Sequence, residues 1–192
     1  MKIALFFGSF NPVHIGHMAI ANYMLEFTEM EQIWFVVSPQ SPFKQKKSML
    51  SEYNRVDLIH QAIGKNTTKY KVSDIEFNLP KPNYTINTLV YLQEKYPNNE
   101  FSLIMGEDNL ESFQKWKNWE QIIENYKLLV YKRLNCEKSI LKNHKNVKIV
   151  DAPLMEISSS FIRESIKANK DVRYFLPEKV FETIDKMNFY KK

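Results

Sequence analysis

The chain has 192 residues, of which 44% are hydrophobic, and its 27 basic and 22 acidic side chains give a formal net charge of +5 at pH 7. This length and hydrophobic content fit a single domain spanning residues 1–192. The sequence has one cysteine, no apolar run near the ~20 residues of a membrane span and no N-terminal cleavage pattern, so we expect a cytoplasmic protein without an intramolecular disulfide.

Short apolar runs alternate with segments of helical periodicity along the chain. Strands are predicted at 3–7, 33–37, 101–105, 127–131 and 147–150, and helices at about 15–28, 51–64, 85–96, 118–124 and 158–168. This alternation is typical of an α/β fold with a Rossmann-like, doubly wound parallel sheet and helices on both faces. From about residue 171, a C-terminal helical segment is expected to close the domain. Ligands bind such sheets beyond the carboxyl ends of the strands, which directs attention to the loops after Phe7, Val37 and Met105.

The first of these loops is Gly8-Ser9-Phe10-Asn11-Pro12-Val13-His14-Ile15-Gly16-His17. A strand that ends in a small-residue turn before a helix directs backbone N–H groups and the positive end of the helix dipole to one spot, which attracts phosphate. Gly8 and Ser9 leave room for an anion. His14 and His17 are three residues apart, so a helical turn would place both imidazoles on one face beside that anion.

Other interpretations of the two histidines are a metal site and a helix cap. A His-x-x-His pair can supply two metal ligands, but a closed site needs about four. The remaining candidates, Cys136, His60 and His144, have no matching spacing. Capping or packing by one histidine alone is the simpler alternative.

The second loop is Ser38-Pro39-Gln40-Ser41-Pro42-Phe43-Lys44. Two prolines stiffen it, and Lys44 is placed to project from it. In the helix that follows, Arg55 faces either solvent or the site. A third segment, Lys81 to Thr85, leads into another helix, where Asn83 or Thr85 could act as the cap or contact a ligand.

Met105-Gly106-Glu107-Asp108 ends a strand and begins a helical stretch. The glycine permits close approach of the backbone, and the acidic residue beyond it suits a ribose hydroxyl. Downstream, Phe113, Trp116 and Trp119 form an aromatic cluster whose spacing is more typical of core packing than of ligand stacking.

Ile157-Ser158-Ser159-Ser160-Phe161-Ile162-Arg163 predicts a second helix N-terminus with anion-binding character. Ser158 is a good cap, and Arg163 lies one turn into the helix. A plain serine cap is the competing interpretation. Two anion-seeking helix starts in one chain suit a polyphosphate ligand.

Together, the first and last motifs resemble those of the nucleotidyltransferase superfamily that carries the HxGH signature. Within it, the chain resembles the bacterial nicotinate-nucleotide adenylyltransferases nearly end to end, including the loop with Lys44, Pro82 to Leu89, Gly106 to Asp108, Trp116 and Val130 to Arg133. The resemblance implies the nucleotidyltransferase fold. It also implies transfer of AMP from ATP to nicotinate mononucleotide, giving nicotinate adenine dinucleotide and pyrophosphate in NAD biosynthesis.

The resemblance further implies a role for each matching residue. The ATP-binding residues would be Gly8, Ser9, Phe10, His14, His17, Gly106, Asp108, Ser158 and Arg163. Gly106 and Asp108 would meet the ribose, while Ser158 and Arg163 would hold the β- and γ-phosphates. The mononucleotide would be bound by Lys44, Tyr84, Thr85, Trp116 and Arg133. The catalytic residues would be His14, His17, Lys44 and Arg163.

Because a phosphate oxygen is already nucleophilic at neutral pH, such a reaction needs alignment and charge stabilisation rather than a general base. Mg²⁺ would arrive bound to ATP, which agrees with a sequence that shows no carboxylate metal cage, and no residue is assigned as a metal ligand. The chain departs from the family pattern at Asn11, Phe43 and Asn83, where Asp, His and Ser are common.

The sequence leaves other functions open. An adenylyltransferase for nicotinamide mononucleotide or phosphopantetheine would share the first and last motifs, although the latter class normally has Thr at the position of His14. A non-catalytic nucleotide sensor would also keep ATP binding. The string H-I-G-H also occurs in class I aminoacyl-tRNA synthetases, but the basic residues form no concentrated stripe, so we expect neither a nucleic-acid nor a membrane partner. Homo-oligomerisation is left open.

Overall fold

The computed structural model describes residues 1–39, 49–134, 136 and 139–191. Its strands are β1 (Lys2–Gly8), β2 (Gln32–Val37), β3 (Tyr70–Ser73), β4 (Glu100–Gly106), β5 (Lys127–Tyr131) and β6 (Val147–Val150). Its helices are α1 (Ile15–Glu26), α2 (Glu52–Ile63), α3 (Thr85–Lys95), α4 (Glu107–Glu111), α5 (Trp119–Asn125), α6 (Ser159–Lys167) and α7 (Glu178–Lys186). Short 3-10 turns are η2 (Ile75–Phe77), η3 (Phe113–Lys115), η4 (Ile140–Asn143) and η5 (Arg173–Phe175).

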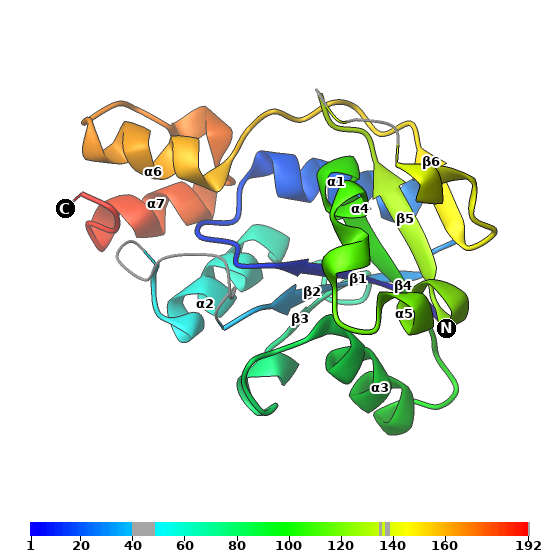
Figure 1. Ribbon diagram of the computed structural model, residues 1–192. Coiled ribbons are helices and arrows are strands. Elements are labelled where there is room, and N and C mark those ends of the chain that lie inside the picture. The colour runs from blue at the N-terminus through cyan, green and yellow to red at the C-terminus, as the bar shows by residue number, and fades with distance from the viewer. Residues whose placement is uncertain (40–48, 135, 137–138, 192) are drawn as a thin grey trace.

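The described strands form one six-stranded sheet in the order β3-β2-β1-β4-β5-β6, and every pair is parallel. The predicted doubly wound α/β fold is confirmed (Figure 1). β1 pairs with β2 on one side and β4 on the other, so the winding of the chain reverses beside β1. The register places Gly8 opposite Val37 and Gly106 opposite Tyr131. The predicted loops therefore all begin at the same edge of the sheet, where the strands end.

β3 was missing from the prediction. Only Tyr70 among its four residues is fully buried, so this edge strand lacks the apolar run that marks the inner strands. The other predicted strands and helices are present, with ends shifted by no more than a few residues.

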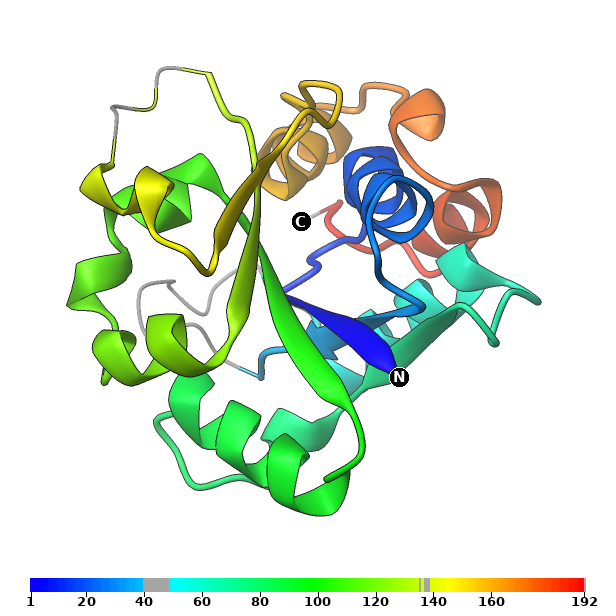
Figure 2. The ribbon, with the colours of Figure 1, turned by 90° about the vertical axis from the view of Figure 1, so that its right-hand side faces the viewer.

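The two faces of the sheet bury separate hydrophobic cores. Successive side chains of a strand point to opposite faces, so Ala4 and Phe6 enter the first core while Ile3 and Leu5 enter the second. Helices α1, α2, α6 and α7 cover the first core, and α3, α4 and α5 cover the second. Figure 2 separates the two groups, with the blue and red helices on one side of the sheet and the green ones on the other.

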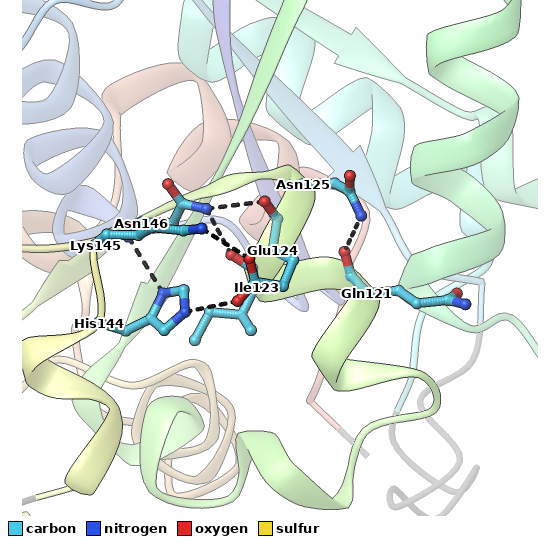
Figure 3. Close-up of polar contacts among 7 residues, drawn as sticks. All are labelled: Gln121, Ile123, Glu124, Asn125, His144, Lys145 and Asn146. Carbon is cyan, nitrogen blue, oxygen red and sulfur yellow. Dashed lines mark hydrogen bonds and ion pairs between the residues drawn. The ribbon is translucent and has the colours of Figure 1, made fainter.

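Side chains before β6 cap the C-terminal end of α5 (Figure 3). Asn146 donates through Nδ2 to the carbonyls of Ile123 and Glu124, at 2.9 and 3.0 Å. The His144 ring contacts the Glu124 carboxylate at 3.1 Å, and Asn125 donates to the Gln121 carbonyl at 2.8 Å. The two Asn146 bonds satisfy carbonyls that the helix end leaves open. His144 thus has a structural partner far from the loop that carries His14.

The segment after α6 returns to the first core. Val172, Leu176, Val180 and Ile184 are buried there, and Thr183 donates a hydrogen bond of 2.7 Å to Gln61 of α2. None of the helices in the described ranges combines the length and apolarity that a membrane crossing requires.

Candidate active site

The loop between β1 and α1 is folded tightly around the Phe10 ring. Phe10 has a left-handed backbone (φ 44°), and its side chain is buried at 1% exposure. A Cβ on Gly8 would lie 2.9 Å from the tip of that ring, so a larger residue at position 8 would displace it. The ring also packs edge-on against His17 at 5.1 Å. Gly8 therefore serves the packing of Phe10 in addition to the room for an anion that the sequence suggested.

His14 and His17 lie side by side, as their spacing predicted. His14 is the N-cap of α1 and His17 lies in its first turn, and their rings stack with centroids 3.7 Å apart. A Cβ on Gly16 would come within 3.0 Å of His14 Nδ1, so the glycine makes room for this ring. The His14 backbone N–H donates to His17 Nδ1 at 3.3 Å, which places the proton of neutral His17 on Nε2.

His14 is held in its neutral form. Its side chain is 4% exposed, and burial, with the nearby charge of Arg133, lowers the pKa of His14 to about 4. Among the described residues, no group hydrogen-bonds its buried Nδ1 atom. A buried polar atom in this state costs free energy, and a ligand atom that reached it would remove that cost.

The N-terminus of α6 docks against the same loop. Ser158 caps the helix, since its Oγ accepts from the Phe161 N–H at 3.1 Å. Ser159 Oγ donates to the Pro12 carbonyl at 2.9 Å, and Arg163 Nη1 donates to the Asn11 carbonyl at 2.7 Å. The two helix starts that the sequence marked as anion-seeking are thus joined directly, although they lie about 150 positions apart in the chain.

A cavity of about 470 Å³ lies where these elements meet. Its lining residues come from β1 and its loop, α1, the end of β5 and the start of α6: Phe6, Gly8, Ser9, Phe10, Asn11, His14, Gly16, His17, Ile20, Met49, Tyr131, Arg133, Met155, Ile157, Ser158, Ser159, Ser160 and Arg163. This volume lies within the range of cofactor-sized sites. The cavity sits beyond the carboxyl ends of the strands, next to the point where the winding reverses.

Arg133 connects this cavity to the end of β4. Its Nη1 donates to the Met155 carbonyl at 3.0 Å, and its buried Nε lies 3.8 Å from Asp108 Oδ1 without a hydrogen bond to any described group. A Cβ on Gly106 would lie 2.2 Å from that Asp108 oxygen. The Asp108 carboxylate therefore occupies the space that the glycine leaves open. The approach of a ribose to Gly106 and Asp108 stays a prediction.

The residues predicted to bind a mononucleotide fall into two groups. Arg133 lines the cavity beside the histidines, whereas Tyr84, Thr85 and Trp116 lie outside its lining. Tyr84 is the N-cap residue of α3, and Lys117 Nζ lies 4.4 Å from the centre of its ring. Lys44, which was assigned to both the catalytic and the mononucleotide groups, lies outside the described residues, as does Phe43.

Two expectations about the second core are settled. Neither Asn83 nor Thr85 caps α3, so that interpretation was wrong: Asn83 instead donates to the Glu76 carbonyl at 2.8 Å. The aromatic cluster contributes to core packing, since Phe113 is fully buried and the Trp116 ring lies 5.2 Å from it. Stacking of Trp116 on a ligand stays a prediction. Trp116 is itself only partly buried.

Sequence reasoning did not assign Arg55. This side chain is fully buried, and its guanidinium donates to the carbonyls of Ser9, Ser38 and Pro39 at 2.6, 2.9 and 3.2 Å. The sequence did hold a signal that Arg55 is buried, because its spacing places it on the same helical face as the buried Leu58, Ile59 and Ile63 of α2.

Comparison with known proteins agrees with this architecture. A family model described as cytidylyltransferase-like matches residues 5–165. A protein of Flavobacterium johnsoniae named "Probable nicotinate-nucleotide adenylyltransferase" is 52% identical over the whole of both chains. One of the same name from Cytophaga hutchinsonii is 51% identical, covering 99% of this chain and 98% of the relative.

Solved structures show the same fold. Plasmodium falciparum nicotinic acid mononucleotide adenylyltransferase complexed with NaAD superposes with a TM-score of 0.83 at 20% identity, over 99% of this chain and 97% of the other. The same protein complexed with APC gives a TM-score of 0.81.

Proposed function

The chain belongs to the cytidylyltransferase-like family and, within it, to the nicotinate-nucleotide adenylyltransferases, and on this premise we propose that it transfers AMP from ATP to nicotinate mononucleotide. The products are nicotinate adenine dinucleotide and pyrophosphate. The observation that carries the proposal is one cavity into which two stacked histidines and two helix N-termini converge.

The transfer itself is a displacement at phosphorus. An oxygen of the mononucleotide 5′-phosphate forms a bond to the α-phosphorus of ATP, and the bond from that phosphorus to the bridging oxygen of pyrophosphate breaks. The attacking oxygen is already ionised at neutral pH, so no proton has to be removed from it. What the protein must supply is alignment and donors for the charge that develops on the α-phosphate and the leaving group.

The donors come from both sides of the cavity. His17 can donate through Nε2 to the α-phosphate, because its Nδ1 accepts the His14 N–H. The β- and γ-phosphates suit the N-terminus of α6, where the helix dipole favours negative charge. Arg163 donates one hydrogen bond to the Asn11 carbonyl and one to Ser160 Oγ. Because a guanidinium has five N–H donors, further donors can reach the phosphates.

The ATP ribose is assigned to Gly106 and Asp108, at the end of β4 beside Arg133. The mononucleotide is assigned to Arg133, Lys44 and the start of α3, where Tyr84 and Thr85 are followed by backbone N–H groups that a helix leaves open. Trp116 is assigned to stack on the pyridine, because it is only partly buried and the next residue, Lys117, lies over the ring of Tyr84 at the start of α3.

A divalent cation, assigned as Mg²⁺, accompanies the triphosphate and offsets its charge. In the part of the chain that the structure describes, no group of three or more His, Cys, Asp and Glu side chains is arranged to hold a metal. We assign the ATP oxygens as the ligands of this cation.

The test is pyrophosphate release by purified protein with ATP, Mg²⁺ and one acceptor at a time: nicotinate mononucleotide, nicotinamide mononucleotide or phosphopantetheine. We expect the highest kcat/KM with nicotinate mononucleotide, and a loss of at least about 100-fold in kcat for His17→Asn. Turnover with phosphopantetheine but not with nicotinate mononucleotide would overturn the proposal. ATP binding without turnover of any acceptor would instead indicate a nucleotide sensor.

A further inference from the structure

Asn11, inside the loop between β1 and α1, is tied from two distant parts of the chain. Its Oδ1 accepts a 3.1 Å hydrogen bond from the Leu50 N–H, just before α2. The same oxygen accepts a 2.8 Å hydrogen bond from the hydroxyl of Tyr190, which is 179 positions away. The Asn11 side chain is 4% exposed, so both bonds are shielded from water.

Tyr190 reaches Asn11 through an unusual backbone path. After α7 the chain adopts left-handed conformations at Asn188 (φ 52°) and at Tyr190 (φ 65°). Such a conformation is rare for a bulky aromatic residue, and it persists where the surroundings impose it. Burial raises the pKa of Tyr190 well above its ordinary value, although the charges of Arg163 and Arg55 act in the opposite direction. The hydroxyl therefore keeps its proton and acts as the donor.

Arg55 holds the other side of the loop. Besides the carbonyls of Ser9, Ser38 and Pro39, its Nε donates to the Leu50 carbonyl at 3.2 Å. No carboxylate among the described residues forms an ion pair with this guanidinium. A buried positive charge, which the Glu52 carboxylate favours electrostatically without a direct ion pair, thus lies behind Ser9, a residue that lines the cavity.

These contacts fix the direction of the loop's peptide groups. The Gly8 carbonyl accepts the Ser38 N–H at 3.0 Å, and the Ser9 carbonyl accepts from Arg55 at 2.6 Å. In a trans peptide the carbonyl and the next N–H point in opposite directions. The N–H groups of Ser9 and Phe10 therefore point away from Ser38 and Arg55, and both residues belong to the wall of the cavity.

We propose that Arg55 and Tyr190 are positioning residues for the adenylyl transfer proposed above, because they hold the loop in the conformation that meets the phosphates of ATP. Neither touches the reacting atoms. Arg55 sets the peptide orientation at Ser9, and Tyr190 anchors the side chain of Asn11 two residues further on. The inference rests on the proposed function only for its kinetic readout, since ATP binding can be measured without turnover.

The decisive variant is Tyr190→Phe, which removes one hydroxyl and keeps the ring. Its matched control is Tyr174→Phe, because Tyr174 is 85% exposed. Titration calorimetry with ATP and Mg²⁺ should show a Kd roughly fivefold higher for Tyr190→Phe, the loss expected for one buried hydrogen bond. The KM for ATP should rise by a similar factor, while the KM for nicotinate mononucleotide stays within about twofold of wild type.

Arg55→Lys tests the second anchor, since it keeps the charge and loses the planar fork that bonds several carbonyls. We expect a larger increase in the Kd for ATP than in Tyr190→Phe. If this variant does not fold, the Tyr190→Phe comparison alone decides. An unchanged Kd for ATP in Tyr190→Phe, equal to that of Tyr174→Phe, would overturn the proposal even if its melting temperature fell. If wild-type protein binds ATP but does not transfer AMP, the proposed function fails while the Kd comparison still decides the inference.

Discussion

The neutral state of His14 makes a quantitative prediction about acid stability. In the unfolded chain this imidazole has an ordinary pKa of 6.5, whereas in the folded protein burial and Arg133 lower it to about 4. Between these two values the unfolded chain binds a proton that the folded protein does not. Stability is therefore lost as the pH falls from 6.5 towards 4, and the contribution is fully present above 6.5.

The size of the effect follows from the two pKa values. If the unfolded chain is fully protonated at His14 and the folded protein is not, the free energy of unfolding falls by about 3 kcal/mol relative to neutral pH. At pH 5 the loss is already about 2 kcal/mol. For a chain of this length, about 2 kcal/mol lowers the melting temperature by about 4–8 °C. His14→Gln removes the titrating group and keeps a polar side chain. Between pH 7.5 and pH 5, its free energy of unfolding should therefore fall by about 2 kcal/mol less than that of wild type.

The assay is urea unfolding of ligand-free protein, followed by circular dichroism at both pH values. His60→Gln is the control, because His60 lies on the exposed side of α2 and should leave the pH dependence close to that of wild type. Carboxylates titrate in all three proteins, so only the difference between them is informative. Equal losses of stability in wild type and His14→Gln would refute the assignment of a buried neutral imidazole at this position.

Two further substitutions probe the site. Gly8→Ala would put a Cβ 2.9 Å from the Phe10 ring, so urea unfolding should show a loss of about 1–3 kcal/mol together with weaker ATP binding. At Gly64 a Cβ meets nothing within 4 Å, but the positive φ of 62° strains an alanine, so Gly64→Ala should lose stability and leave ATP binding unchanged. Equal ATP binding in both variants would contradict the prediction. Trp116→Ala should raise the KM for nicotinate mononucleotide by about tenfold without a matching change in the KM for ATP. Trp119→Ala, the control, should leave the KM for nicotinate mononucleotide unchanged. A selective effect of Trp116→Ala on the KM for ATP would reject stacking on the pyridine.

The inner strands of the sheet could be predicted because burial on both faces leaves a simple mark in the sequence. β2 is buried at every position and β1 at most of them, so each appears as a continuous apolar run. β3 lies at the edge of the sheet with one fully buried side chain, and its Tyr-Lys-Val-Ser alternation is too short to form the apolar run that marks the inner strands. The alternation of strands and helices then determined the parallel doubly wound arrangement.

The candidate site was predictable where its chemistry is local in the chain. His14, His17, Ser158 and Arg163 belong to short motifs at helix starts, where residue type and spacing carry the information. The anchors of the loop follow a different rule. Arg55 binds backbone carbonyls, which every residue type possesses, so its partners have no signature in the sequence.

The bond between Tyr190 and Asn11 has a consequence for the order in which the molecule is built. A chain leaves the ribosome with its N-terminus first, so the loop that begins at Gly8 is synthesised long before its partners. A nascent chain that has reached β6 holds every strand of the sheet, but it lacks Ser159, Arg163 and Tyr190. We therefore expect the candidate ATP-binding cavity to be completed last, because a chain that ends at β6 still lacks the start of α6, Tyr190 and the α6 and α7 side chains that bury the first core.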